Sequence, residues 1–199
     1  MNVPYVDHYR DRMNQADWAE ELTRKHLEVP LPRRWAHVQG VAARARALAP
    51  ILGDDADLLE AAAWLHDVGY SPELVETGFH PLDGARFLHM VHGADDRLVR
   101  LVANHSCALL EAEERGLRAA LEAEFPPLRA RRLMDALLWC DMTTASDGDQ
   151  ATADLRIAEI VSRYGEDSVV GRFIRRASPE IFAAVARVEK ARADHPSGG

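Results

Sequence analysis

Long apolar runs and cysteines are scarce in this sequence of 199 residues. It contains no run of about 18 consecutive apolar residues, so no segment is expected to span a membrane. The first residues, from Met1 to Arg12, are polar and lack the apolar core of a secretory signal. Two cysteines, Cys107 and Cys140, are too few for a disulfide framework and too far apart for a Cys-x-x-Cys metal site. These absences predict a protein of the reducing cytoplasm, with both thiols acting as small buried side chains.

Basic residues are also outnumbered, since 24 lysines and arginines face 32 aspartates and glutamates and the formal net charge is −8. Nucleic acids and acidic membranes are bound chiefly through excess positive charge. We therefore expect neither DNA nor a membrane as a partner. A local basic pocket for a small phosphorylated molecule remains compatible with this balance. Lysine is nearly absent, so such a pocket would be built from arginine, whose planar fork suits phosphate.

Hydrophobic residues recur at spacings of three and four through most of the sequence, and no segment alternates apolar and polar residues as a strand would. The length corresponds to about one domain. We therefore predict an all-α fold, a single helical bundle with additional flanking helices. The expected parts are an N-terminal helical extension at 1–30, a bundle core at 31–145, C-terminal helices packed on the core at 146–195, and a disordered tail at 196–199.

Prolines and glycines set the expected helix boundaries. We expect one helix from Pro32 to about Leu52, and another from about Leu109 to Glu124 that ends before a pair of prolines. A helix at 168–193 is expected to be either continuous or broken near Pro179.

Four expected helices place an imidazole or a carboxylate on their apolar side. His66 and Asp67 end one apolar helix, where a buried ionised carboxylate is costly unless it is paired or bound to a metal. His37, His105 and Asp141 lie on the apolar stripes of three others. Each alone is more often a satisfied core residue, but together they leave several buried groups in need of partners. A divalent metal would satisfy them jointly, and histidine and aspartate without thiolate suit Fe, Mn, Co or Zn with open coordination positions.

The order His37, His66-Asp67, Asp141 on successive helices resembles the HD-domain superfamily of metal-dependent phosphohydrolases. The HD dipeptide ends an apolar helix, a histidine stands 29 positions upstream, and an aspartate ends a later apolar helix. This combination is far more specific than the dipeptide alone. The resemblance covers about residues 33–144 and implies that the predicted bundle is an HD domain.

Two further segments resemble the HD proteins that bind two metals. Residues 79–85 resemble their His-x-x-x-Gly-Ala segment, and residues 104–106 resemble the segment with their following histidine. In this arrangement Asp67 bridges the two ions, and His66 and Asp67 are also the expected catalytic residues. The resemblance implies one or two divalent ions, a di-iron pair among the options. The implied ligands are His37, His66, Asp67, His80, His105 and Asp141.

Five of the nine histidines have no such role. His89 and His92 lie at the polar end of an expected helix, and either could replace His80 as a ligand on spacing alone. The remaining three lie near the chain termini and are expected to be solvated: His8, His26 and His195.

The resemblance implies a phosphohydrolase that cleaves a phosphoester or phosphoanhydride bond of a small, nucleotide-like substrate through attack of metal-bound hydroxide. Two alternatives stay open, because HD-type di-iron oxygenases share the six-ligand layout and other HD modules bind ligands without turnover. The relatives that hydrolyse diadenosine tetraphosphate usually carry lysine where Tyr70 stands here. The expected substrate-binding residues are Arg33, Arg34, Arg44, Arg86 and Thr144.

Overall fold

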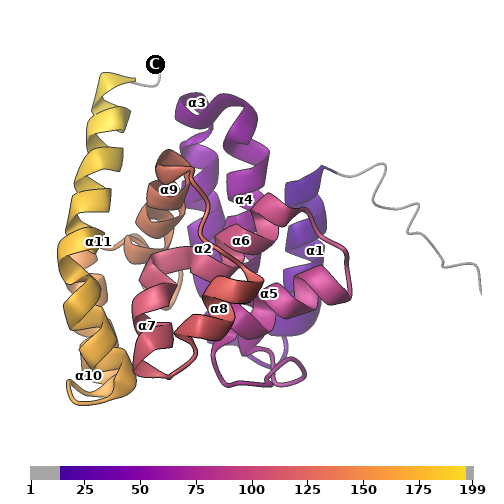
Figure 1. The fold of residues 1–199 in the computed structure, drawn as a ribbon. Coiled ribbons are helices and arrows are strands. Elements are labelled where there is room, and N and C mark those ends of the chain that lie inside the picture. Colours follow the sequence, from indigo (N-terminus) through magenta and orange to yellow (C-terminus); the bar gives the residue numbers. More distant parts are fainter. Residues whose placement is uncertain (1–13, 196–199) are drawn as a thin grey trace, which may run out of the picture.

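The computed structural model describes residues 14–195, and within this range it contains helices, short turns and no β-strand (Figure 1). The predicted all-α fold is confirmed. His8 and the expected tail at 196–199 lie outside the described range. The helices up to residue 104 are α1 (Gln15–Leu27), α2 (Pro32–Ala47), α3 (Ala49–Leu52), α4 (Ala56–Leu65), α5 (His80–Met90) and α6 (Asp96–Asn104). They are followed by α7 (Ala108–Glu114), α8 (Arg118–Glu124), α9 (Arg131–Met142), α10 (Ala153–Tyr164) and α11 (Val169–Asp194).

Helix α4 lies at the centre of the bundle. It is apolar on nearly all sides, as expected of a helix surrounded by protein, and every residue from Ala61 to Leu65 is buried. Its neighbours include α1, α2, α6 and α9. The C-terminal end of α4 therefore carries His66 and Asp67 into the interior.

Helices α10 and α11 form one side of the molecule, and the long α11 runs along the bundle (Figure 1). A second apolar cluster joins them to α9, with Leu138 and Met142 packed against Phe173 and Ile174. Helix α11 continues through Pro179 without a break. Among residues 14–195, every helix is too short or too polar to cross a bilayer.

Two expected helices are interrupted. The expectation of one helix to Leu52 is wrong, because α2 ends at Ala47 and Pro50 lies in the first turn of the separate α3. The expected helix at 109–124 is also wrong, because it divides into α7 and α8. Gly116 lies between them with a φ of 72°, a left-handed conformation that ends a helix.

Candidate metal centre

Five segments bring the six predicted ligands together at the centre of the bundle. The side chains come from the middle of α2, the C-terminal end of α4, the first residue of α5, the turn after α6 and the last turn of α9. All except His80, which is slightly more exposed, are buried. The six predicted ligands are His37, His66, Asp67, His80, His105 and Asp141.

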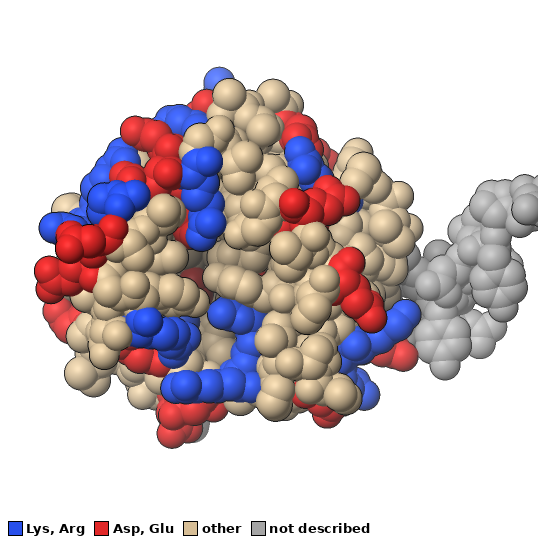
Figure 2. All heavy atoms as spheres, turned by 90° about the horizontal axis from the view of Figure 1, so that it is seen from below, with Lys and Arg blue, Asp and Glu red and all other residues tan. Residues whose placement is uncertain are grey.

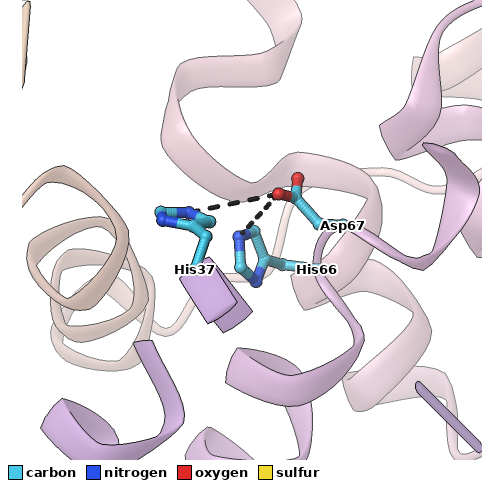
Figure 3. A group of neighbouring side chains, drawn as sticks. All are labelled: His37, His66 and Asp67. Atoms are coloured by element: carbon cyan, nitrogen blue, oxygen red, sulfur yellow. Dashed lines mark ion pairs between the residues drawn. The ribbon is translucent and has the colours of Figure 1, made fainter. Parts of the chain in front are cut away.

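The ligand atoms fall into two groups that share Asp67. In the first group, Asp67 Oδ2 lies 3.5 Å from His66 Nε2 and 4.0 Å from His37 Nε2 (Figure 3). The second group contains Asp67, His80 and His105, with Asp67 Oδ1 3.3 Å from His80 Nε2. In each group, the candidate ligand atoms lie within 4.8 Å of one another. Asp67 thus presents one carboxylate oxygen to each group, as a bridging ligand would.

Asp141 extends the first group. Its Oδ1 lies 3.1 Å from His37 Nε2, and its other oxygen accepts a hydrogen bond from the hydroxyl of Ser106. The carboxylate is therefore held from one side by Ser106 and faces the ligand cluster with the other.

Main-chain carbonyls orient three of the four histidines. In each ring, Nδ1 lies at hydrogen-bond distance from a carbonyl oxygen, so Nδ1 carries the proton and donates it. Nε2 is then left with a lone pair inside the ligand cluster, the form in which imidazole binds metals. The pairs are His37 with Ala145 at 3.0 Å, His66 with Ala63 at 2.7 Å, and His105 with Val102 at 2.6 Å.

These residues fit a divalent metal. His66 Nε2 is buried and finds no hydrogen-bond partner in the described part of the chain, which is unusual for a buried polar atom. His37 Nε2 and Asp141 Oδ1 lie 3.1 Å apart, so both atoms face the same space in the cluster. A cation would satisfy both contacts. The nitrogen and oxygen donors suit Zn, Mn, Fe or Co.

The protonation states also suit metal binding. Burial lowers the pKa values of His80 and His105, so both rings are neutral at pH 7. Burial opposes ionisation of Asp67, but the Arg34 guanidinium beside it holds the pKa of Asp67 well below its usual range. His80 and His105 therefore face an ionised Asp67 carboxylate as neutral imidazoles.

Arg34 and Tyr70 cover one side of this centre. Arg34 donates to Asp67 Oδ2, and its guanidinium lies 3.5 Å from the centroid of the Tyr70 ring. Tyr70 in turn stacks on the His80 ring, with centroids 3.9 Å apart and an interplanar angle of 17°. The stack holds the His80 ring against Tyr70 and brings a cation beside the Asp67 carboxylate.

A left-handed turn follows His105. Ser106 and Cys107 have φ values of 47° and 64°, and within residues 14–195 they are the two non-glycine residues with positive φ. Such conformations cost about 1–3 kcal/mol each and persist where the surroundings impose them. Here the turn carries the Ser106 hydroxyl to Asp141. Ser106 thus positions Asp141, one of the predicted metal ligands.

Replacing Ser106 with alanine should weaken metal binding by about 10- to 100-fold, because Asp141 loses the donor that holds it. The measurement is a metal titration with a competing chelator, with the melting temperature recorded in parallel. The control is Ser178→Ala, which removes a hydroxyl that donates to Ile174 O at 2.7 Å in α11, away from the centre. Equal metal affinities of the two variants would contradict the positioning role.

Two adjoining cavities open beside the centre. A cavity of about 150 Å³ is lined by four of the ligands and by apolar residues of α10 and α11, including Ile160 and Phe173. A cavity of about 380 Å³ lies on the side of His37 and reaches the loop before α2. Figure 2 shows a face of the molecule on which basic side chains gather beside a hollow. The two cavities share four lining residues: Arg34, Arg156, Arg163 and Tyr164.

The predicted substrate-binding residues divide between the cavities and other places. Arg33 and Arg34 line the larger cavity, and Arg34 lines both. Arg86 lies elsewhere and pairs with Glu124, with its Nε 2.8 Å from Oε2. Its guanidinium is held by this ion pair, away from both cavities. The sequence does not distinguish Arg86 from Arg34, because both are arginines on expected helices.

Arg44 and Thr144 are likewise placed outside both cavities. Arg44 Nε donates to Thr143 Oγ1 at 2.6 Å and its guanidinium lies over the Trp139 ring. Thr144 is fully buried and donates its hydroxyl to Cys140 O at 2.7 Å. Both side chains therefore serve the packing of α9.

The remaining histidines lie apart from the ligand groups. His89 is exposed and His92 packs edge-on against Phe87, so His80 is the histidine of α5 that reaches Asp67. The expectation that His26 is solvated is wrong, because only 8% of the residue is exposed. Its position near the N-terminus hid the fact that α1 packs against the central α4. His195 is exposed, as expected.

The sequence reading missed Ser106 and the lining residues Arg156, Arg163 and Tyr164. The spacing of these three residues in α10 is equally typical of a solvated helix face. Only the packing of α10 beside the centre shows that they line the cavities. The positive φ of Ser106 has no sequence signal, because serine rarely adopts it.

Comparison with known proteins gives one family. The family model described as HD domain matches residues 34–139, which is more than half of the chain. Neither the curated proteins nor the solved structures include a significant match. The matched segment contains five of the six predicted ligands, while Asp141 and the cavity walls of α10 and α11 lie beyond its end.

Proposed function

The chain belongs to the HD domain family, and from this premise we propose that it is a metal-dependent phosphohydrolase. Its substrate would be a small, nucleotide-like molecule, cleaved at a phosphoester or phosphoanhydride bond. The observation that carries this proposal is the sharing of Asp67 between two buried ligand groups. Two divalent ions that share a carboxylate would be typical of sites that displace an oxygen from phosphorus.

Each group of side chains would hold one ion. His37, His66 and Asp141 would complete one site and His80 and His105 the other, with Asp67 common to both. When bound, the ions would polarise phosphoryl oxygens and lower the pKa of a coordinated water. His66 and Asp67 would act at the reacting centre, because the His66 ring lies between those of His37 and His105 and Asp67 belongs to both ligand groups.

The surrounding residues would bind and orient the phosphoryl group. Arg34 already lies beside Asp67 and could pair with a phosphoryl oxygen through its planar fork. Ile160 and Phe173 form an apolar wall that limits the entry of bulk water and strengthens these electrostatic contacts. The chain thereby supplies geometry and charge complementarity around the ions.

Removal of metal provides the test of this function. Phosphate release from a panel of nucleotides and phosphoesters should fall below about 1% of its initial rate after chelator treatment, because each ion stabilises transition-state charge by several kcal/mol. Readdition of Mn, Co, Zn or Fe should restore it. Metal content is measured on the same samples.

Three results would contradict the proposal. The first is phosphate release at the same rate with and without metal. The second is turnover that requires iron and consumes oxygen. The third is a nucleotide that binds and is never hydrolysed. The second result would indicate an oxygenase and the third a ligand-sensing module.

A further inference from the structure

Three arginines converge on one carboxylate at the larger cavity. Glu159 of α10 accepts from Arg156 NH1 at 2.8 Å and also pairs with Arg163. Arg33 NH2, from the first turn of α2, lies 3.9 Å from Glu159 Oε1. One negative charge thus faces three guanidinium groups. The local excess of positive charge contrasts with the net charge of −8 of the chain.

We call Arg33, Arg156 and Arg163 the arginine cluster. Most N–H donors of this cluster have no hydrogen-bond acceptor among the described residues. A guanidinium carries five N–H donors. The described residues accept one hydrogen bond from each of the three, with Ser146 Oγ as the acceptor for Arg33. The arrangement therefore offers many donors to an incoming anion with several oxygens.

Arg156 provides independent evidence for a ligand. Its side chain is 8% exposed, and its Nε is buried with no hydrogen-bond partner in the part of the chain that the structure describes. Buried donors of this kind normally have an acceptor. Arg156 also lines both cavities, so an anion bound in either cavity would lie beside its guanidinium.

The cluster adjoins the metal centre. Arg156 NH2 lies 3.9 Å from Oδ1 of Asp141, and His37 lines the same cavity as the three arginines. An anion at the cluster would therefore lie next to a phosphoryl group at the centre. The two cavities differ in size, about 150 Å³ at the ligands and about 380 Å³ at the cluster, so the larger one has room for the rest of a substrate.

We propose that this cluster is a second phosphate subsite and that the substrate is a phosphoanhydride, such as a nucleoside di- or oligophosphate. This inference rests on the proposed function. One phosphoryl group would lie beside Asp67 and the next at the arginines. Water would add its oxygen to the phosphorus beside Asp67 while the bridging P–O bond breaks. The leaving phosphate keeps the bridging oxygen and the electron pair of that bond, and one proton of the water passes to it or to solvent.

The test compares two anions on the full chain. Calorimetric titration with imidodiphosphate, a non-hydrolysable diphosphate, should show at least about tenfold tighter binding than titration with orthophosphate. Arg33→Gln and Arg163→Gln should each weaken imidodiphosphate binding by about tenfold and change orthophosphate binding less than twofold. The Arg33 side chain is 73% exposed and that of Arg163 is 32% exposed, so both variants should fold. The control is Arg86→Gln, which breaks an ion pair outside both cavities.

The results distinguish the subsite from the function. Imidodiphosphate binding that is unchanged in both cluster variants, or no tighter than orthophosphate binding, would overturn the subsite even if metal-dependent phosphate release is observed. Selective loss of imidodiphosphate binding in the variants would support the subsite. If phosphate release proves independent of metal in the same preparations, the proposed function fails while that binding result stands.

Discussion

Asp67→Asn should reduce metal-dependent phosphate release by about 1,000-fold or more and lower the metal content to at most one ion per chain. The carboxylate presents one oxygen to each ligand group, whereas the amide of asparagine has a single oxygen and no charge. Loss of several kcal/mol of transition-state stabilisation corresponds to a rate effect of this size. Metal analysis and phosphate assays on the purified variant measure both effects.

The control for Asp67→Asn is Asp135→Asn. Asp135 also pairs with an arginine, Arg187, whose Nε lies 2.6 Å from its Oδ2, but neither residue contributes to the ligand groups. This variant should lose stability and keep its metal. Retention of two ions by Asp67→Asn would show that the carboxylate does not bridge them. Equal activity of the two variants would show that Asp67 has no role in the reaction.

Gly69→Ala should destabilise the protein by about 3 kcal/mol or more, which lowers the melting temperature by about 10 °C. A Cβ atom at Gly69 would lie 2.2 Å from the carbonyl oxygen of His80 and 2.6 Å from the main-chain nitrogen of Gly84. Both are backbone atoms, so relief requires α5 to move away from the turn after α4. That movement would separate His80 from Asp67 and weaken the second metal site as well.

Thermal unfolding and metal titration of Gly69→Ala test this expectation. The matched control is Gly116→Ala, where the φ of 72° imposes strain but no atom lies within 4 Å of the added Cβ. That substitution should cost about 1–2 kcal/mol and leave metal binding unchanged. If the two variants melt at the same temperature, the close approach of Gly69 and Gly84 does not constrain the centre.

Five of the six predicted ligands could be selected from local sequence pattern, whereas His80 followed only from the resemblance of residues 79–85. A histidine or aspartate on an apolar helical stripe points into the core, and the stripes of α2 and α9 are evident from spacing, as is the apolar character of α4 on nearly all sides. Their convergence on Asp67 then follows from the packing of these helices around one interior. His105 differs from the expected position on a helical stripe, because α6 ends at Asn104 and the histidine lies in the following turn.

The substrate side of the site was not predictable in the same way. Arg34, Arg86 and Arg163 all follow the same helical pattern of exposed charge, and only tertiary packing decides which of them lines a cavity. The break between α7 and α8 has a different cause. The strong helix formers on both sides concealed the effect of Gly116, whose left-handed φ ends α7.

The orientation of the histidines has a consequence for mutational robustness. His66 and His105 each donate Nδ1–H to the carbonyl three residues earlier, in the last turn of their own helices. These carbonyls belong to the group that every helix leaves without an intrahelical partner at its C-terminal end. The acceptors are main-chain atoms, so no substitution of a neighbouring side chain removes them. The ligand geometry can therefore persist while the residues around it diverge, as long as α4 and α6 end where they do.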